Sequence, residues 1–260
     1  MCFPPEAVPP PVPDDLLRTE EPPESFDVEL TAADGGGISA AYALAPETGG
    51  TAVLVLPDRR GLFDYYRNLV RSFAAAGHPA IAIDYFGRTT DHADRGPGFD
   101  FEPHLKQTSP AQVQLDLRAA REHLRHVSGA TTFVTLGFCF GGTQSYLATT
   151  DAELGLAGAV AMYGGLNERR LRIFPRPAHE AARMSGPILA LYGGADRGIP
   201  QELRDEFDAA LTAAGVEHEF HVYPGAPHSF FDVGHDTFTA ECADAWRRVL
   251  GFLERVTDPT

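Results

Sequence analysis

The chain has 260 residues and a mass of 28.1 kDa, enough for one large domain with its own buried core. Its 36 acidic residues outnumber the 21 basic ones, and the formal net charge of −15 disfavours nucleic acid and anionic lipid as partners. Three cysteines are too few for a disulfide framework, and the chain lacks both a secretory signal pattern and a membrane-length apolar run. We therefore expect a cytoplasmic protein without a membrane span.

Proline dominates the start of the chain. Residues 1–25 contain eight prolines, a composition that favours an extended arm over a packed element. We predict that this arm precedes a single domain over residues 26–260. The domain opens with two alternating runs, 27–31 and 38–44, joined by a glycine-rich turn. This pattern predicts a β-hairpin at the edge of a sheet.

Continuous apolar runs then alternate with segments of helical periodicity, as expected when helices bury both faces of a parallel sheet. The expected strands are residues 52–56, 80–83, 133–136, 157–162, 188–191 and 219–222. The expected helices are residues 62–76, 109–127, 200–214 and 238–252. The fold class is α/β, with a mostly parallel central sheet. Two segments without periodicity, 87–107 and 166–185, follow strands and are expected to wall a ligand site.

The segment from Gly137 to Gly142 contains the most informative motif. It reads G-x-C-x-G-G between an apolar strand and a helix, and it corresponds to the G-x-S-x-G nucleophile elbow of the α/β-hydrolase fold with Cys139 replacing serine. Glycines permit the strained turn, and the start of a helix favours a thiolate. The backbone N–H of Phe140 is expected to form part of an oxyanion hole. Cys242, on the apolar face of the last helix, is expected to be structural.

An acid and a histidine follow in the order that this fold requires. Asp196 ends a strand and glycine turn, and His228 ends a strand and a Pro/Gly loop. We expect His228 to take the proton of Cys139 and Asp196 to orient the imidazole. The other histidines lack the spacing of a metal site, so we expect neither a metal nor a cofactor.

These motifs resemble the dienelactone hydrolase family over residues 26–254. The matching motifs are G-x-C-x-G-G, G-x-x-D ending at Asp196, and G-x-x-H-S-F around His228. The resemblance implies hydrolysis of a small ester or lactone through an acyl-thioenzyme.

Four further residues are assigned from this resemblance and from the fold. Arg59, after the first central strand, is expected to supply the second oxyanion N–H. Asp58 stands where family members usually carry a glutamate that contacts the thiol, and Arg88 matches a carboxylate anchor. Asp232 replaces a second, arginine anchor; it either points into the site and opposes an anionic substrate, or caps the last helix or faces solvent.

Two other functions remain open from the sequence. An amidotransferase or related cysteine peptidase also uses a cysteine elbow, but there the histidine belongs to an H-x-E motif, whereas His228 precedes serine and phenylalanine. A catalytically silent hydrolase fold that only binds small molecules is the other alternative. We expect the protein to be a monomer or small homo-oligomer whose partner is a small ester or lactone.

Overall fold

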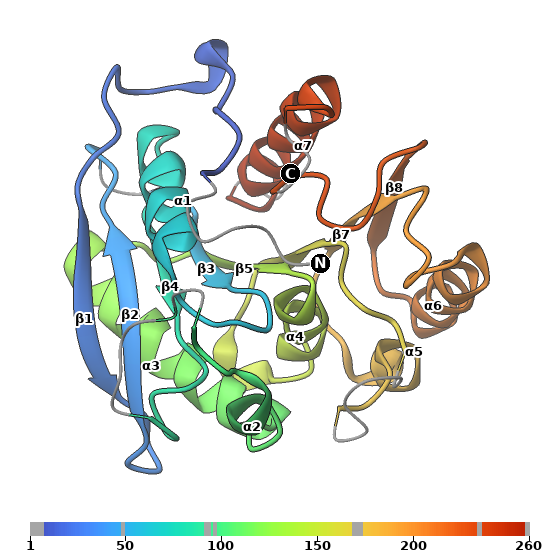
Figure 1. Cartoon of the computed structure of the whole chain (residues 1–260), viewed down its shortest axis with the longest axis horizontal. Coiled ribbons are helices and arrows are strands. Elements are labelled where there is room, and N and C mark those ends of the chain that lie inside the picture. Colours follow the sequence, from blue (N-terminus) through green and yellow to red (C-terminus); the bar gives the residue numbers. More distant parts are fainter. Residues whose placement is uncertain are drawn as a thin grey trace.

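The computed structural model describes residues 8–47, 50–90, 95, 98–167, 174–232 and 236–257. One eight-stranded sheet, in the order β1-β2-β4-β3-β5-β6-β7-β8, runs through the molecule (Figure 1). Pairs from β4 to β8 are parallel, whereas β2 pairs antiparallel with both β1 and β4. The strands are β1 Ser25–Thr31, β2 Gly37–Ala43, β3 Ala52–Leu56, β4 Ala80–Ile83, β5 Phe133–Phe138, β6 Gly158–Met162, β7 Ile188–Gly193 and β8 His218–Tyr223.

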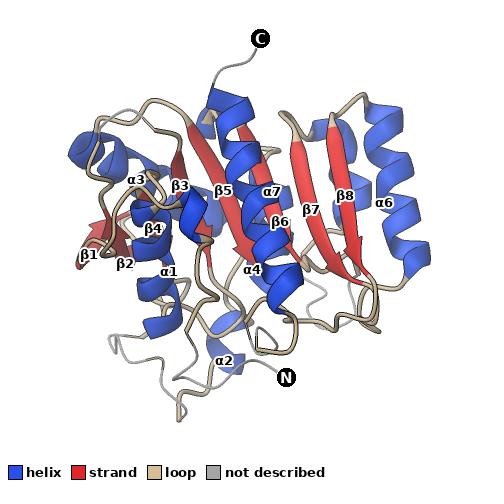
Figure 2. Ribbon diagram, turned by 90° about the horizontal axis from the view of Figure 1, so that it is seen from above, coloured by secondary structure: helices blue, strands red, loops and turns tan. Residues whose placement is uncertain are grey.

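Helices cover both faces of the sheet. Helices α1 and α7 lie on one face, and α3, α4 and α6 lie on the other (Figures 1 and 2). The helices are α1 Asp64–Ala75, α2 Glu102–Leu105, α3 Pro110–Ser128, α4 Phe140–Ala148, α5 Pro177–Glu180, α6 Gln201–Ala214 and α7 Thr239–Thr257. The predicted fold class is therefore confirmed.

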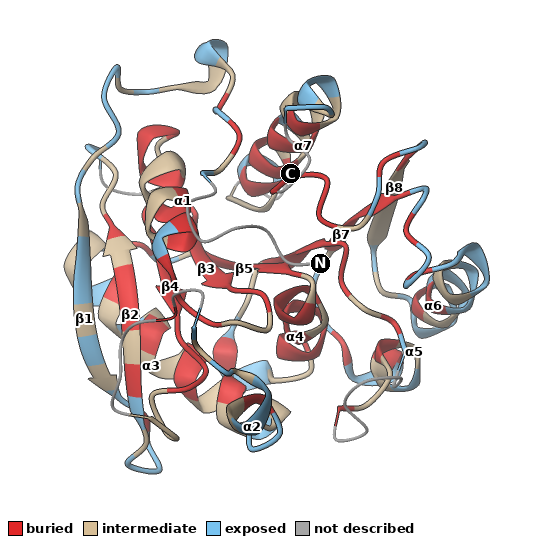
Figure 3. Ribbon diagram, in the orientation of Figure 1, coloured by how far each residue is buried: buried red, intermediate tan, exposed pale blue. Residues whose placement is uncertain are grey.

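The two faces of the central strand β3 pack in different apolar clusters. In β3, Val53 and Val55 pack in the cluster that contains α1 and α7, whereas Leu54 and Leu56 pack in the cluster that contains α3. All four are fully buried, as are most residues of the central strands (Figure 3). Burial on both faces explains why these strands are continuous apolar runs and do not alternate.

The β-hairpin and the capping box predicted from local sequence are both present in the structure. The hairpin pairs Thr31 with Gly37 in antiparallel register. At the start of α3, the Ser109 side chain accepts from the Gln112 N–H, and the Gln112 side chain accepts from the Ser109 N–H. This reciprocal capping box satisfies backbone groups that the helix itself leaves unpaired.

The proline-rich segment, where described, lies along the domain. Val12 is buried, and the indole N–H of Trp246 donates to the carbonyl oxygen of Pro10 at 3.0 Å. Asp15 pairs with Arg247 on the same helix, at 2.6 Å. Residues 8–24 contain a short 3-10 helix, Asp14–Leu16, and they contact both α1 and α7, which the sequence alone did not indicate.

Candidate active site

Cys139 occupies the sharp turn between β5 and α4. Its backbone has φ 54° and ψ −109°, a conformation that costs energy for a residue with a side chain. The Cys139 N–H donates to the carbonyl oxygen of Met162 on β6 at 3.0 Å, and its own carbonyl accepts from Thr143 N–H at 3.2 Å. The sheet and the first turn of α4 therefore hold this strained residue from both sides.

Close backbone contacts explain the glycines around the turn. A Cβ on Gly137 would lie 2.0 Å from the carbonyl oxygen of Gly141, and one on Gly141 would lie equally close to the backbone of β3. A Cβ on Gly142 would lie 2.6 Å from the Cα of Gly164. A side chain at any of these positions would push α4 off the sheet. The steric reason inferred from the sequence is confirmed.

His228 and Asp196 lie beside Cys139, each on the loop that follows a late strand. Nδ1 of His228 donates to Oδ2 of Asp196 at 2.6 Å, and the same imidazole lines one cavity with Cys139, whose thiol contributes to the pKa of His228. Oδ1 of Asp196 accepts from the N–H of Gly198 at 2.7 Å, which fixes the carboxylate. The structure thus places the imidazole of His228 next to the thiol of Cys139 and in a hydrogen bond with the carboxylate of Asp196.

The charges at this site follow from its contacts. Burial lowers the pKa of His228, but the contacts with Asp196 and Cys139 outweigh burial and raise that pKa to about 10. Burial raises the pKa of Asp196, but the hydrogen bond to His228 and the remaining contacts lower it overall. At neutral pH the imidazole is therefore protonated beside an ionised carboxylate.

Backbone strain is concentrated around the imidazole. Among the described residues, the non-glycine residues with positive φ are Cys139, Tyr163 and Ser229, which surround His228. The fully buried ring of Tyr163 lies 5.0 Å from that of His228, centroid to centroid, and its hydroxyl donates to Asp232 at 2.8 Å. Such strain persists only where the surrounding packing enforces it, as it does at functional sites.

A cavity of about 600 Å³ opens over Cys139. Its size is typical of a small-molecule site. Leu105, Phe140 and Phe174 form apolar walls, whereas Arg59 and the exposed Glu102 contribute opposite charges. The other described lining residues are Thr143, Gln144, Gly165, Asn167 and His228.

The turn after β3 directs Arg59 toward this cavity and Asp58 away from it. The Asp58 carboxylate is buried, pairs with the Arg60 guanidinium at 3.0 Å and accepts from the Arg60 N–H at 2.8 Å. The Asp58 N–H donates to the Tyr66 hydroxyl at 2.7 Å. Arg59 instead lines the cavity, with its guanidinium 5.0 Å from the ring centroid of Phe101. Asp58 therefore closes the turn, and no described contact joins it to the thiol.

Arg88 and Asp232, the two residues expected to influence substrate charge, are not among the described residues that line the cavity. Arg88 pairs with Asp116 at 2.6 Å and with Asp34 at 2.7 Å, which ties the loop after β4 to α3 and the hairpin. Asp232 is 2 % exposed and accepts from the Tyr163 hydroxyl. Asp232 therefore neither lines the described cavity nor faces solvent, and it lies too far before Thr239, the first residue of α7, to be the N-cap of that helix.

Several lining residues have no counterpart in the sequence analysis. The aperiodic segments were expected to wall the site, and Glu102, Leu105, Asn167 and Phe174 do come from them, but nothing in the sequence singled out these four. Gln144 was missed because it lies inside a helix. Its one available signal was a polar residue on the same helical face as Phe140 and Leu147.

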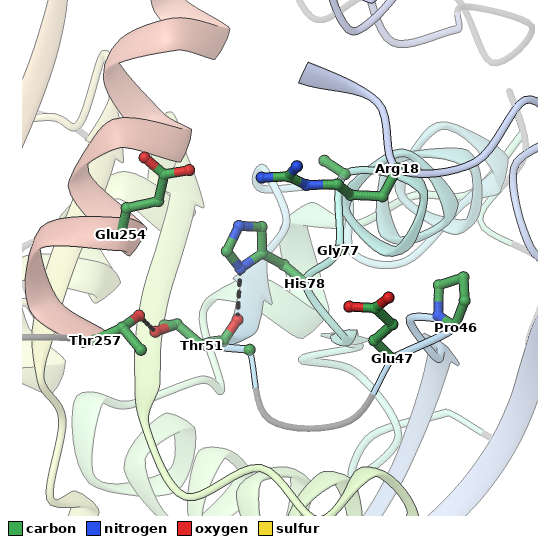
Figure 4. A pocket seen from close by; sticks show the side chains of 10 residues that line it. Arg18, Pro46, Glu47, Thr51, Gly77, His78, Glu254 and Thr257 are labelled. Carbon is green, nitrogen blue, oxygen red and sulfur yellow. Dashed lines mark hydrogen bonds between the residues drawn. The ribbon is translucent and has the colours of Figure 1, made fainter. Parts of the chain in front are cut away.

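A second cavity of about 460 Å³ lies at the opposite, amino-terminal end of the strands (Figure 4). Arg18, Glu47, His78 and Glu254 line it, and Nδ1 of the buried His78 faces the carbonyl oxygen of Thr51 at 2.9 Å. Among the described residues, no group of three His, Cys, Asp or Glu side chains could hold a metal ion. No helix in the described part of the chain is long and apolar enough to cross a membrane.

We expect the buried His78 to make the stability of the folded protein depend on pH. Burial lowers its pKa below the ordinary value of 6.5, so the unfolded chain binds this proton more readily than the folded protein. The contribution of neutral His78 to the free energy of unfolding is present above pH 6.5 and is lost as the pH falls below this value. When the free energy of unfolding is measured with urea at pH 7 and at pH 5, it should fall less for His78→Gln than for the wild type. Equal falls would mean that His78 does not contribute to this pH dependence.

Comparisons with known proteins agree with this geometry. The sequence profile described as "Dienelactone hydrolase family" matches residues 39–257. A protein of Methylorubrum extorquens assigned as a carboxymethylenebutenolidase is 33% identical over 236 residues, covering 88% of this chain and 80% of the relative. A Yersinia pestis protein with the same assignment is 32% identical and covers 86% of each chain. A crystal structure from Klebsiella pneumoniae, assigned as a dienelactone hydrolase, superposes with a TM-score of 0.76 at 28% identity, over 89% of this chain and 99% of the other.

Proposed function

The chain belongs to the dienelactone hydrolase family, and we propose that it cleaves a small ester or lactone through an acyl-thioenzyme on Cys139. The observation that carries this proposal is that Cys139 and His228 line one cavity of about 600 Å³, with the imidazole of His228 hydrogen bonded to Asp196. Relatives assigned as carboxymethylenebutenolidases support a lactone as one substrate class.

In the first half of the reaction, the Cys139 thiolate attacks the substrate carbonyl carbon. The carbonyl oxygen gains the negative charge, and the backbone N–H groups of Phe140 and Arg59 stabilise it. His228, which holds a proton at neutral pH, donates that proton to the departing alkoxide as the C–O bond breaks. The products of this half are an alcohol and a thioester on Cys139; from a lactone, the alcohol remains attached to the acyl group.

In the second half, the now neutral His228 accepts a proton from water. The resulting hydroxide attacks the thioester carbonyl, and the C–S bond breaks to release a carboxylic acid and restore the thiolate. Asp196 keeps Nδ1 of the imidazole protonated, so that the other ring nitrogen faces the reacting atoms throughout.

Neither rival function has a supporting observation. The histidine of this site is oriented by an acid on a separate loop, after β7, and not by a residue two positions farther along the chain. A silent binding protein would not need the strained backbone of Cys139 or the charged imidazole beside it. The strained backbone costs stability, and both features have a use in catalysis.

The first test is hydrolysis of p-nitrophenyl acetate with and without prior treatment with iodoacetamide. Turnover that is lost in proportion to labelling of Cys139 supports the proposal. Absence of turnover would support a binding protein, and turnover that survives complete labelling would contradict a cysteine mechanism.

We further expect Arg59 and Glu102 to set the response to substrate charge. Arg59→Gln keeps the backbone N–H but removes the cation, so kcat/KM for a carboxylate-bearing lactone should fall about tenfold relative to a neutral lactone of equal size. Glu102→Gln should change this ratio in the opposite direction. Arg88→Gln is the control, because Arg88 is not among the described residues that line the cavity. A kcat/KM ratio that responds only to the Arg88 substitution would refute this role of Arg59 and Glu102.

A further inference from the structure

Gln144 is a buried amide without a partner. It is 1 % exposed, and its Nε2 has no hydrogen-bond partner within the described part of the chain. The other polar side chains of α4 all have partners: the Thr143 hydroxyl donates to Gly165, Ser145 bonds Thr135 and Val160, and Tyr146 bonds Tyr192. An unpaired buried amide destabilises a fold and calls for an explanation.

The surroundings of Gln144 call for an apolar residue. Phe140 and Leu147 lie on the same face of α4, and both belong to the apolar cluster that also contains Leu105 and Phe174. Methionine or leucine would fill this position without an unpaired polar group. A sequence that departs from its local pattern in this way usually does so at a functional site.

Gln144 also lines the cavity that contains Cys139. It stands five positions after the nucleophile, on the helix that follows it, and Leu105, Phe140 and Phe174 line the same cavity. Rotation about the last side-chain torsion is soft, so the amide can turn its N–H group toward a bound molecule. The missing partner is therefore one that a ligand in this cavity can supply.

We propose that Gln144 selects substrates that carry an oxygen acceptor, such as a ketone or ether oxygen, away from the scissile carbonyl. The inference rests on the proposed function of the same cavity. The substrate oxygen accepts the Gln144 N–H, and the rest of its acyl chain packs on Leu105, Phe140 and Phe174. A substrate with a methyl group in place of that oxygen leaves the amide unpaired and is disfavoured.

Matched substrates test this selection. The probes are p-nitrophenyl 4-oxopentanoate against 4-methylpentanoate, and 5-oxohexanoate against 5-methylhexanoate, in which a methyl group replaces the ketone oxygen. The wild type should prefer the oxo ester about tenfold in kcat/KM in at least one pair. Gln144→Met should abolish that preference and should raise the melting temperature, because an isosteric apolar side chain replaces an unpaired amide.

Gln114→Met is the control. Gln114 lies on α3, and its amide donates to the carbonyl oxygen of Leu147 at 3.0 Å, outside the described lining of the cavity. This variant should keep the wild-type preference and should lose stability. If Gln144→Met leaves the preference unchanged, if the wild type shows none, or if the Gln144 variant unfolds at a lower temperature, the selection proposed here is wrong.

Binding measurements separate this inference from the proposed function. In Cys139→Ala protein, calorimetry with the corresponding unreactive primary amides should show the oxo compounds binding about tenfold more tightly, and Gln144→Met should remove the difference. If Cys139→Ala still hydrolyses the esters at the wild-type rate, the cysteine mechanism fails. The binding ratio then still decides the role of Gln144.

Discussion

Cys139→Ala should lower kcat for p-nitrophenyl acetate by roughly 10⁴-fold or more, because the acyl-thioenzyme can no longer form. The backbone N–H groups remain in this variant, so some rate above that in water should persist. Fold and stability should change little, since Cys139 is only partly buried. A variant with near wild-type turnover would refute the mechanism.

Cys242 provides the matched control for this experiment. It is buried on α7, and burial raises the pKa of its thiol to about 12. Cys242→Ala should therefore keep full activity and full labelling at Cys139. Both variants are best made in a Cys2→Ser background, so that mass spectrometry of the iodoacetamide product reports one reactive thiol. Labelling at Cys242 together with loss of activity would point to a different nucleophile.

His228→Ala should lower kcat by about four orders of magnitude, and adding Asp196→Asn should cost little more. Asp196 acts only through the imidazole, so its loss has no further effect once that ring is absent. The double-mutant cycle in kcat measures this coupling. Losses that multiply would mean that Asp196 serves only as a turn residue.

A spectroscopic measurement checks the same pair without turnover. Asp196→Asn removes the negative charge that stabilises the imidazolium of His228, so NMR titration should show this pKa falling from about 10. Asp208→Asn is the control, because Asp208 makes a comparable contact of 3.1 Å with His218, away from the site. That variant should leave both the titration of His228 and the activity unchanged.

The contacts of Arg88, Asp58 and Asp232 could not be inferred from the sequence. Their places along the chain were known, but their partners were not. Arg88 pairs with Asp116 and Asp34, residues 28 and 54 positions away. Neither acid could be identified as a partner from spacing. A charged side chain near a catalytic loop is therefore weak evidence of substrate contact until its own partners are known.

The sequence by itself determined the strands, the helices α1, α3, α6 and α7, the glycine requirement at the turn before α4, and the order of Cys139, Asp196 and His228. These features are local, since apolar periodicity, capping and tight turns depend on neighbouring residues. Only the tertiary structure decided the position and the contact partners of individual side chains. Examples are the ion pairs of Arg88, the burial of Asp232 and the unpaired amide of Gln144. Such contacts depend on the packing of elements distant in sequence, and a shift of a few ångströms in that packing makes or breaks them.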